Sequence, residues 1–331
     1  MTKVVRFHEF GGPEVLRIEN IDVAPPGPGQ VRIRVKAIGL NRAEALMRAG
    51  TYIETPELPS RLGLEAAGIV DALGSGVSGF AAGDVVSTIP PISMIEYPAH
   101  GELATFPAAH IVKHPASLTF EAAAALWMQF LTAYGALIEI AQLRAGDFVA
   151  ITAASSSVGL AAIQIAKKVG ATPIAITRSS AKKQALIDFG ATHVIAANEE
   201  DLEARLKAIS GSTGVRVVLD AVGGPIFNPL TAAMARGGIL LEYGGLSPEP
   251  TPFPLFTVLG KCLTLRGYLV HEIVQDPRRL EAAKTFIAEG LTDGSLKPVI
   301  AKTFDFADIV EAYRYLESNE QFGKVVVSLN T

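Results

Sequence analysis

The first candidate for chemistry is a loop of small residues between a predicted strand and a predicted helix. Residues 148–177 read as strand, loop, helix and strand over about 30 residues, the length of a dinucleotide-binding unit. The loop runs TAASSSVG from Thr152 to Gly159. Fitted to the G-x-G-x-x-G pattern, only Gly159 matches, and Ala154 and Ser156 take the places of the other two glycines.

Small side chains at these places can serve the same structural purposes as the glycines of the pattern. Ala154 allows a tight turn, and Ser156 lets the backbone approach a pyrophosphate and adds a hydroxyl. The N–H groups and the positive dipole end of the helix favour an anion. The loop therefore predicts a pyrophosphate site. The alternative is that the serines at 155–157 only cap an ordinary crossover helix.

The end of the next predicted strand selects between the two nicotinamide cofactors. The sequence there is TRSSAKK from Thr177 to Lys183, and the first acid downstream is Asp188. A ribose 2′-hydroxyl is bound by a carboxylate at this place, whereas a 2′-phosphate carries roughly −1.5 to −2 charges and needs a cation. Arg178 at the strand tip therefore predicts NADPH rather than NADH, while Lys183 alone fits a solvated helix start.

Alternating strand and helix patterns would place this loop at the edge of a parallel sheet. From Thr119 onward, short apolar runs alternate with helical periods, which predicts βαβ units with right-handed crossovers. The fold class is therefore α/β, with a doubly wound parallel sheet. The expected strands are 148–152, 172–177, 193–196, 215–220, 239–243 and 263–267, and the expected helices are 157–169, 181–189, 202–209 and 279–289.

The first third of the chain has a different pattern of apolar and turn-forming residues. Its β-branched or alternating runs are separated by glycine and proline turns, which predicts an irregular, mostly antiparallel β domain. The C-terminal tail shows the same strand-like pattern and is expected to fold back onto the first domain. The expected elements are strands at 4–8, 15–18, 31–37, 66–73, 85–89, 299–304 and 324–329, with a helix at 306–317.

Composition excludes several classes of protein. The 331 residues are 49% hydrophobic and 19% charged with a formal charge of −4, which argues against a disordered chain and against a dedicated binder of nucleic acid or anionic membranes. Cys262 is the single cysteine, so neither an internal disulfide nor a four-cysteine zinc lobe can form. The N-terminus lacks a signal-peptide pattern, and the apolar stretch at 122–128 is far short of the ~20 residues of a membrane span. We expect a cytoplasmic protein.

Several longer stretches resemble one known family. They are FGGPEVL at 10–16, IGLNRAEALMRAGTY at 38–52, LGLEAAGIVDALGSGVSGFAAGDVV at 62–86, QFLTAYGAL at 129–137, LRAGDFVAITAASSSVGLAAIQIAKKVGA at 143–171 and GKVVV at 323–327. Together they resemble the zinc-independent medium-chain dehydrogenase/reductase superfamily, in its quinone oxidoreductase or zeta-crystallin-like branch. The resemblance implies a GroES-like catalytic domain at 1–121 with 297–331, and a Rossmann NADPH-binding domain at 122–296.

The sequence differs from the zinc-binding members of this superfamily at the positions of their metal ligands. Those relatives have a cysteine at the place of Asn41, a histidine at Leu64 and another cysteine near residues 128–129. Because a catalytic zinc needs three protein ligands and an open position, we expect no metal here. The structural zinc lobe is also missing, since residues 90–101 hold no cysteine. At Ser156 and Ser157, quinone reductases more often carry two glycines.

The resemblance also implies which residues line the site. Asn41, Tyr52 and Thr132 match positions beside the nicotinamide, and Lys324 matches a cofactor-contacting lysine of the C-terminal motif. The remaining matches are Ser155, Ser156, Ser157, Val158 and Gly159 for the pyrophosphate, Thr177, Arg178 and Lys182 for the 2′-phosphate, Asn198 and Val222 for the adenosine end, and Tyr243, Gly244, Gly245, Tyr268, Leu269 and Val270 for nicotinamide-side loops.

A reaction without a metal restricts the substrate. No zinc polarises a carbonyl, so the hydride acceptor must already be electrophilic, as a quinone or an activated alkene is. Asn41 and Tyr52 are the expected catalytic polar groups. Tyr52, in the Gly50-Thr51-Tyr52 context that resembles enoyl-thioester reductases, is either the proton donor or only a wall of the cleft, because a phenol with a pKa near 10 is a slow acid unless it is tuned.

Three functions remain open at this stage. The leading one is an NADPH-dependent quinone or enone reductase that acts on a small molecule. An enoyl-thioester reductase is the alternative within the same class, and a non-catalytic NADPH-binding or structural protein is the alternative from another class. The family suggests a homodimer that pairs through the strand at 263–269.

Some residues receive only a structural interpretation. His110 and His114 have a spacing that metals accept, but they lie between two prolines in a predicted strand, which favours surface or packing roles. Cys262 precedes an apolar strand and is expected to be a small buried hydrophobe, and Trp127 is expected in the core.

Overall fold

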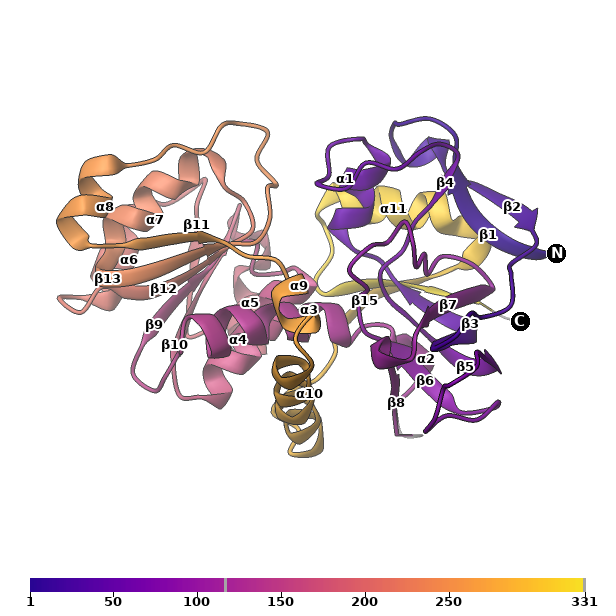
Figure 1. Ribbon diagram of the computed structural model, residues 1–331. Helices are drawn as coiled ribbons and strands as arrows, with labels where there is room; N and C mark the ends of the chain where they lie inside the picture. The colour runs from indigo at the N-terminus through magenta and orange to yellow at the C-terminus, as the bar shows by residue number, and fades with distance from the viewer. Residues whose placement is uncertain (116–117, 330–331) are drawn as a thin grey trace. The chain divides into compact units, whose positions relative to one another are not determined.

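The computed structural model describes residues 1–115 and 118–329, which form two compact units (Figure 1). The first unit runs to Met128 and resumes at Pro298, and the second is Gln129–Lys297. The division after Met128 lies seven residues beyond the expected one. The reason is packing: Ala123, Ala124 and Ala125 are fully buried against strand residues of the first unit.

The second unit is built on a six-stranded sheet in which all strand pairs are parallel (Figure 1). The strand order is β11-β10-β9-β12-β13-β14, which in chain order within the sheet is 3-2-1-4-5-6. This is the doubly wound order of dinucleotide-binding folds, and the predicted fold class is confirmed. The strands are β9 (Phe148–Ile151), β10 (Thr172–Thr177), β11 (His193–Ala196), β12 (Val215–Asp220), β13 (Met234–Glu242) and β14 (Thr264–Gly267).

Continuous apolar runs explain why the central strands are parallel and buried. Val149, Ala150 and Ile151 of β9 are inaccessible to water, as are Val217, Val218 and Leu219 of β12. Such runs suit strands that are covered on both faces. The helices of this unit are α3 (Trp127–Tyr134, which begins in the first unit), α4 (Ser157–Lys168), α5 (Lys183–Phe189), α6 (Leu202–Ser210), α7 (Phe227–Ala233), α8 (Leu255–Lys261), α9 (His271–Val274) and α10 (Pro277–Thr292), with a π-helical turn at Gly135–Ile140.

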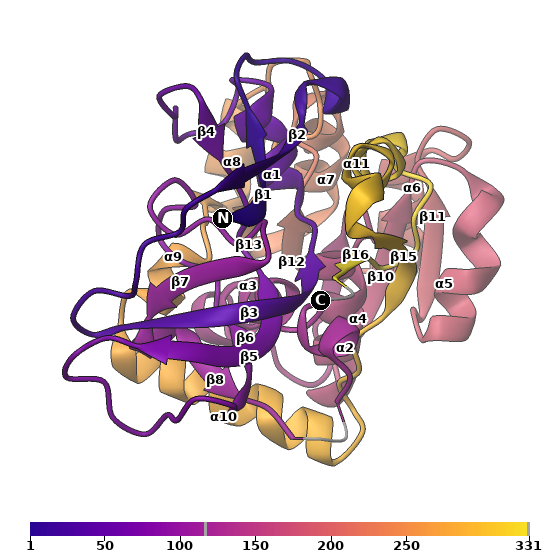
Figure 2. The same cartoon turned by 90° about the vertical axis from the view of Figure 1, so that its right-hand side faces the viewer.

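The first unit is mostly antiparallel, as the sequence predicts (Figure 2). One sheet has the order β2-β1-β4, and a larger one has the order β15-β16-β3-β5-β6-β8 with β7 also pairing with β3. Only the β15–β16 pair is parallel among the described strands of this unit. The strands are β1 (Thr2–Phe7), β2 (Arg17–Ile21), β3 (Gln30–Gly39), β4 (Ser60–Arg61), β5 (Ala66–Leu73), β6 (Val85–Thr88), β7 (Leu103–Pro107), β8 (Ile111–Lys113), β15 (Ile300–Asp305) and β16 (Lys324–Ser328).

The tail completes this unit, as expected. β16 pairs with β3, and α11 (Ile309–Ser318) lies beside α1 (Arg42–Arg48) in both views (Figures 1 and 2). Ala312 and Tyr313 of α11 are fully buried in the core that β1, β3 and β5 supply. α2 (Phe120–Ala123) packs on β3 and β5. The unit therefore needs both ends of the described chain.

The stretch Phe120–Ile140 has the length and hydropathy of a membrane span, which the seven-residue apolar run did not suggest. Its most apolar window has a mean hydropathy of 1.3 but is 78% buried inside the protein. Core helices of water-soluble proteins show the same combination, because their apolar surface is already covered. Trp127 in this stretch is buried, as predicted, and its indole N–H donates to the Ser87 hydroxyl at 2.9 Å.

Two local expectations are wrong. Cys262 is exposed rather than buried, because it ends α8 in a left-handed conformation with φ of 53° and does not enter β14. His110 lies in a 3₁₀ turn, Ala108–His110, rather than in a strand, and β8 begins one residue later. Within the described residues, neither histidine belongs to a group that could hold a metal ion.

Candidate functional site

The loop after β9 forms the sharp turn that a pyrophosphate site requires. Ala153 turns the chain in a left-handed conformation with φ of 45°, one residue before the Ala154 that the pattern marks. Ser156 then caps α4, and its hydroxyl accepts the Gly159 N–H at 3.1 Å. The amides of Ser157 and Val158 have no acceptor within the described residues. The start of α4 therefore offers free N–H donors and a positive dipole end to an anion.

Gly159 is required by close packing. A Cβ at this position would lie 2.6 Å from the Ala154 carbonyl oxygen and 2.7 Å from that of Ala153. Any larger residue would push the helix away from the turn. Close helix–strand packing is the role that the third glycine has in the dinucleotide-binding pattern.

A buried hydrogen bond ties this loop to the neighbouring strand. The Thr152 hydroxyl donates to Asp220 Oδ1 at 2.6 Å and accepts the Ala221 N–H at 2.9 Å. Thr152 and Asp220 are both inaccessible to water. Because β9 and β12 are parallel neighbours, their carboxyl ends lie at the same edge of the sheet, where α/β folds bind ligands.

The tip of β10 carries the cations predicted for a 2′-phosphate. Arg178 is exposed, and its side chain has no hydrogen bond or ion pair among the described residues. Lys182 donates to the Ser155 hydroxyl at 3.1 Å, which brings it to the pyrophosphate loop. Glu199 is also near, because it accepts the Ser180 N–H at 3.0 Å. The sequence did not reveal this acid, which reaches the strand tip from the β11 side.

The loops after β12 and β13 border the same edge. The Tyr243 phenol hydrogen-bonds with Ser156, and burial, then Asp220, raises the pKa of this phenol well above its usual value. Gly244 lies against Ala221, whose carbonyl oxygen would be 2.8 Å from an added Cβ, whereas Gly245 faces open space. Of the residues that the resemblance implied, the structure therefore brings Tyr243 and Gly244 to the loop.

Other implied residues of this unit lie in different surroundings. Thr132 is buried in α3, and Tyr268 is only 3% exposed, with its hydroxyl donating to the Leu131 carbonyl at 3.4 Å. Leu269 is exposed and Val270 is nearly buried. Asn198 and Thr177 lie at the exposed ends of β11 and β10, and Val222 follows β12.

The first unit holds the remaining site residues in a buried polar network. The Lys324 ammonium donates to Glu65 Oε2 at 2.6 Å and to Asn41 Oδ1 at 2.7 Å, and the exposed fraction of Lys324 is 1%. The Asn41 amide nitrogen donates to the Gly39 carbonyl at 3.0 Å and to Glu44 Oε1 at 3.2 Å. Both ends of the Asn41 side chain are therefore bound within the unit.

Glu44 extends this network toward α11. It closes a capping box at the start of α1, accepts the Leu64 N–H at 2.9 Å, and accepts the Tyr313 hydroxyl at 2.8 Å. The fully buried His100 lies 3.6 Å away, and burial lowers the pKa of its imidazole, so the ring is neutral at pH 7. The sequence analysis gave Glu44, His100 and Tyr313 no role, because their partners are distant in the chain.

Tyr52 is a polar group of this unit whose side chain lacks a partner among the described residues. Its phenol is half-buried against the core and has no hydrogen bond among the described residues. Burial, and then the charges of Glu54 and Glu44, raise the pKa of the phenol. It therefore stays protonated across the neutral range and is a weaker acid than an exposed tyrosine.

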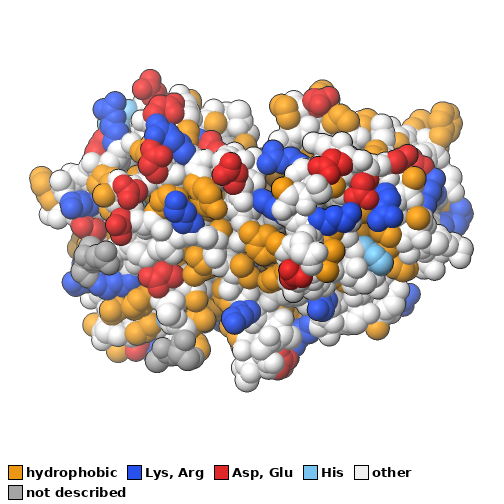
Figure 3. Space-filling view, turned by 180° about the vertical axis from the view of Figure 1, so that it is seen from behind, with side chains coloured by type: hydrophobic (Ala, Val, Ile, Leu, Met, Phe, Trp, Pro, Cys, Tyr) orange, Lys and Arg blue, Asp and Glu red, His pale blue; other side chains and the backbone are white. Residues whose placement is uncertain are grey.

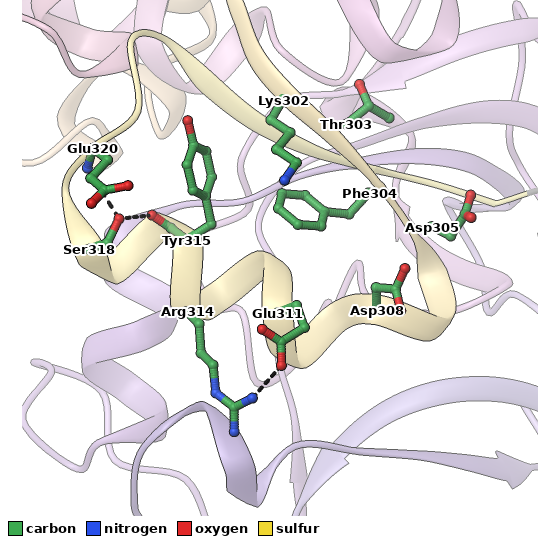
Figure 4. A pocket seen from close by; sticks show the side chains of 10 residues that line it. All are labelled: Lys302, Thr303, Phe304, Asp305, Asp308, Glu311, Arg314, Tyr315, Ser318 and Glu320. Atoms are coloured by element: carbon green, nitrogen blue, oxygen red, sulfur yellow. Dashed lines mark hydrogen bonds and ion pairs between the residues drawn. The ribbon is translucent and has the colours of Figure 1, made fainter.

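A surface hollow of 760 Å³ lies elsewhere in the first unit, between β15 and α11 (Figure 4). Lys302 extends over the ring of Phe304, with its ammonium 4.5 Å from the ring centroid, and Arg314 pairs with Glu311. The cations of this hollow already contact its own aromatic and acidic groups. Its lining includes none of the residues of the buried network or of the loop after β9, so it is not the candidate site.

The residues present do not fit a catalytic zinc. Leu64 offers no lone pair, and the Asn41 amide oxygen is bound to a lysine ammonium, whose charge repels a divalent cation. The two polar clusters therefore suit a different chemistry: one offers free N–H donors at a helix start, and the other holds a neutral amide and a phenol.

Comparison with known proteins places this geometry in a family. Two family models match the chain: an alcohol dehydrogenase GroES-like domain at 27–116 and a zinc-binding dehydrogenase at 157–289. Quinone oxidoreductase 1 of Escherichia coli strain K12 is 33% identical over 98% of each chain. The chain belongs to the quinone oxidoreductase branch of the medium-chain dehydrogenase/reductase superfamily. The resemblance seen in the sequence is confirmed, and so is the GroES-like assignment of the first unit.

Solved structures extend the likeness to the fold. The structure of Escherichia coli quinone oxidoreductase complexed with NADPH has a TM-score of 0.91 and 32% identity, and the match covers 98% of this chain and 99% of that one. The CurK enoyl reductase has a TM-score of 0.89 and 26% identity, with 99% of both chains covered.

The Lys324–Glu65 pair gives a testable prediction about stability. Glu65 is fully buried, and burial raises the pKa of its carboxyl while Lys324 lowers it. Lys324→Met leaves that carboxyl without its counter-ion, which we expect to cost about 3–5 kcal/mol near pH 8. Because the folded pKa then rises further above the unfolded value, the loss shrinks as pH falls toward 5.

Chemical denaturation at pH 5 and pH 8 measures this effect. Lys302→Met, which replaces an exposed lysine of β15, is the matched control and should change stability by less than ~0.5 kcal/mol. An equal loss in both variants, or a loss at Lys324 that does not depend on pH, would contradict the assignment.

Proposed function

We propose that this protein is an NADPH-dependent oxidoreductase that transfers a hydride to a quinone or an activated alkene. The observation that carries the proposal is the pairing of an anion-binding helix start at Ser157 with an unpartnered Arg178 at the next strand tip. The Escherichia coli relative that was solved with NADPH supports the choice of cofactor, and the quinone oxidoreductase relatives support the choice of acceptor.

Different residues of the second unit bind different parts of the cofactor. The free amides of Ser157 and Val158 and the hydroxyls of Ser155 and Ser156 bind the pyrophosphate, and Gly159 lets α4 pack closely on the turn that carries them. Arg178 and Lys182 bind the 2′-phosphate beside Thr177. Asn198 and Val222 border the adenosine end, and Thr132, Tyr243, Gly244, Gly245, Tyr268, Leu269 and Val270 border the nicotinamide.

The first unit, by this proposal the catalytic domain, provides the polar groups for the reaction. When bound, the reduced nicotinamide supplies the hydride. Tyr52 donates the proton, and Asn41 orients the acceptor with its amide held by Glu44 and Lys324. Lys324 serves the cofactor through this network. The reaction is zinc-independent, because Leu64 and Asn41 do not fit the metal, and its acceptor must therefore be electrophilic on its own.

A second candidate function is reduction of an enoyl thioester, which the likeness to the CurK enoyl reductase favours. A third is non-catalytic binding of NADPH. The three functions differ in the acceptor that is reduced. A quinone reductase acts on a molecule without a thioester, an enoyl reductase acts on a thioester, and a non-catalytic binding protein reduces no acceptor. The discriminating feature of a thioester reductase is a site for the phosphopantetheine arm.

We further propose a cytoplasmic homodimer with no nucleic-acid or membrane partner. β14 is the edge strand of its sheet, and edge strands pair readily with a second copy. Next to it, α8 presents exposed apolar residues, among them Phe256 at 85% and Leu259 at 62%. On the face that Figure 3 shows, cations and acids of the described residues are interspersed without a continuous basic field. The mass in solution tests the dimer.

Turnover with a panel of acceptors tests the proposed function. NADPH oxidation with 9,10-phenanthrenequinone and with an enone should be fast. Crotonyl-CoA should be a poor acceptor, because a quinone or enone reductase has no need of a site for the phosphopantetheine arm. Faster turnover of crotonyl-CoA would favour the enoyl reductase. NADPH binding without turnover of any acceptor would leave the non-catalytic function.

Arg178→Ala should change the choice of cofactor. Charge-assisted hydrogen bonds contribute about 1.5–3 kcal/mol, so the ratio of kcat/KM for NADPH over NADH should fall roughly 10- to 100-fold. Arg278→Ala, which removes an exposed arginine of α10, is the control and should leave the ratio unchanged. An unchanged ratio in the Arg178 variant would show that the 2′-phosphate lies elsewhere.

Tyr52→Phe should slow the reaction without weakening cofactor binding. Loss of a general acid costs about 10²-fold or more in kcat. The phenol is protonated at pH 7, because its ordinary pKa is near 10 and burial raises it further. Steady-state kcat with an enone and the Kd for NADPH measure the two effects. Tyr97→Phe, at another half-buried tyrosine of the unit, is the control. Full kcat in the Tyr52 variant would rule out the acid role.

A further inference from the structure

Two carboxyl groups lie side by side at the ligand edge of the second unit's sheet. Asp220 is the last residue of β12, Glu242 is the last residue of β13, and the two are partners in the parallel pairing. The sequence analysis assigned neither residue a role. Their environments are very different, and that difference decides where a proton resides.

Asp220 is surrounded by donors. Its Oδ1 accepts the Thr152 hydroxyl at 2.6 Å and the Val222 N–H at 2.9 Å, and its Oδ2 accepts the Gly223 N–H at 3.2 Å. Hydrogen bonds of this kind stabilise a carboxylate. Through these donors Asp220 holds the turns that follow β9 and β12.

Glu242 lacks a comparable set of donors: the Gly244 N–H lowers the pKa of its carboxyl, but burial and Asp220 raise that pKa by more. Both of its carboxyl oxygens are shielded from water, and neither makes a hydrogen bond of normal length and angle within the described residues. Gly223 covers it, since a Cβ there would lie 3.9 Å from Oε2. The titratable groups that face it are Asp220 from β12 and the neighbouring Tyr243 phenol, whereas its β14 partner is Gly267. A second buried anion beside Asp220 would be repelled without compensation.

We propose that Glu242 is a positioning residue that acts in its neutral acid form: it keeps its own proton beside Asp220, holds this edge of the sheet at a single negative charge, and so permits an anionic dinucleotide to bind. The inference rests on the proposed function for the identity of the ligand. Ionisation of Glu242 places two carboxylates side by side, loosens the turns that Asp220 holds, and repels the phosphates at the adjacent loop.

The sign of the pH dependence follows from the surroundings of Glu242. Burial, and then Asp220, raises the pKa of Glu242 to about 9. A bound anionic cofactor stabilises the protonated form further, so affinity is constant up to about pH 8 and falls above pH 9. The pKa of the folded protein also exceeds that of the unfolded chain, so the stability of this unit decreases as pH rises between the two values.

Equilibrium binding of NADPH from pH 7 to pH 10 tests the proposal. The Kd of the wild-type protein should rise about tenfold by pH 10, because one proton is linked to binding. Glu242→Gln, which is neutral at every pH, should bind with an unchanged Kd at pH 7 and a flat profile. Glu281→Gln, at an exposed acid of α10, should follow the wild-type profile. Parallel profiles for wild type and Glu242→Gln would overturn the proposal.

A measurement without cofactor separates this inference from the proposed function. The Tm of Glu242→Gln should exceed that of the wild type, by a margin that grows from pH 6 to pH 9. Glu242→Thr, a smaller neutral residue, provides the same test if the glutamine variant does not fold. No growing margin would contradict the neutral Glu242. A wild-type protein that does not bind NADPH at pH 7 would overturn the proposed function and the ligand-binding part of this inference, while the Tm comparison still decides the protonation state.

Discussion

The turn between β9 and α4 packs the backbone of this protein closely against itself at the predicted pyrophosphate site. A Cβ on Gly159 would meet the Ala154 carbonyl oxygen at 2.6 Å, and Ala153 accepts a left-handed conformation to make the turn. This closeness directs the first amides of α4 outward, and the buried Thr152–Asp220 hydrogen bond fixes the turn to β12. Anion binding, cofactor choice and the role of Glu242 all depend on this geometry.

The two units use polar groups in opposite ways. The second unit leaves donors free at its sheet edge: the amides of Ser157 and Val158 and the guanidinium of Arg178. The first unit satisfies its buried charges internally, through Lys324, Glu65 and their neighbours, and leaves Tyr52 as a free donor. Free donors suit the binding of a charged ligand. A pre-satisfied network suits a reaction in which orientation, rather than a metal, supplies the catalysis.

Local patterns predicted much of the fold but less of the site. The bounds of β5, β10, β11 and β12 agree with the predicted strands, because continuous or alternating apolar runs end at clear turn residues. The serine loop and Arg178 could be found because they adjoin strand ends in the sequence. The Lys324–Glu65 and Asp220–Glu242 pairs could not, since their partners meet only through sheet pairing. Cys262 was misjudged because a left-handed helix end has no hydrophobic signature.

The most direct measurement is amide hydrogen exchange across residues 153–160, with and without NADPH. The account predicts that saturating NADPH slows exchange at the amides of Ser157 and Val158, which have no acceptor in the protein, and that NADH at the same concentration protects them less. Unchanged exchange at this turn under conditions where NADPH is bound would contradict the account, because the cofactor would then lie elsewhere.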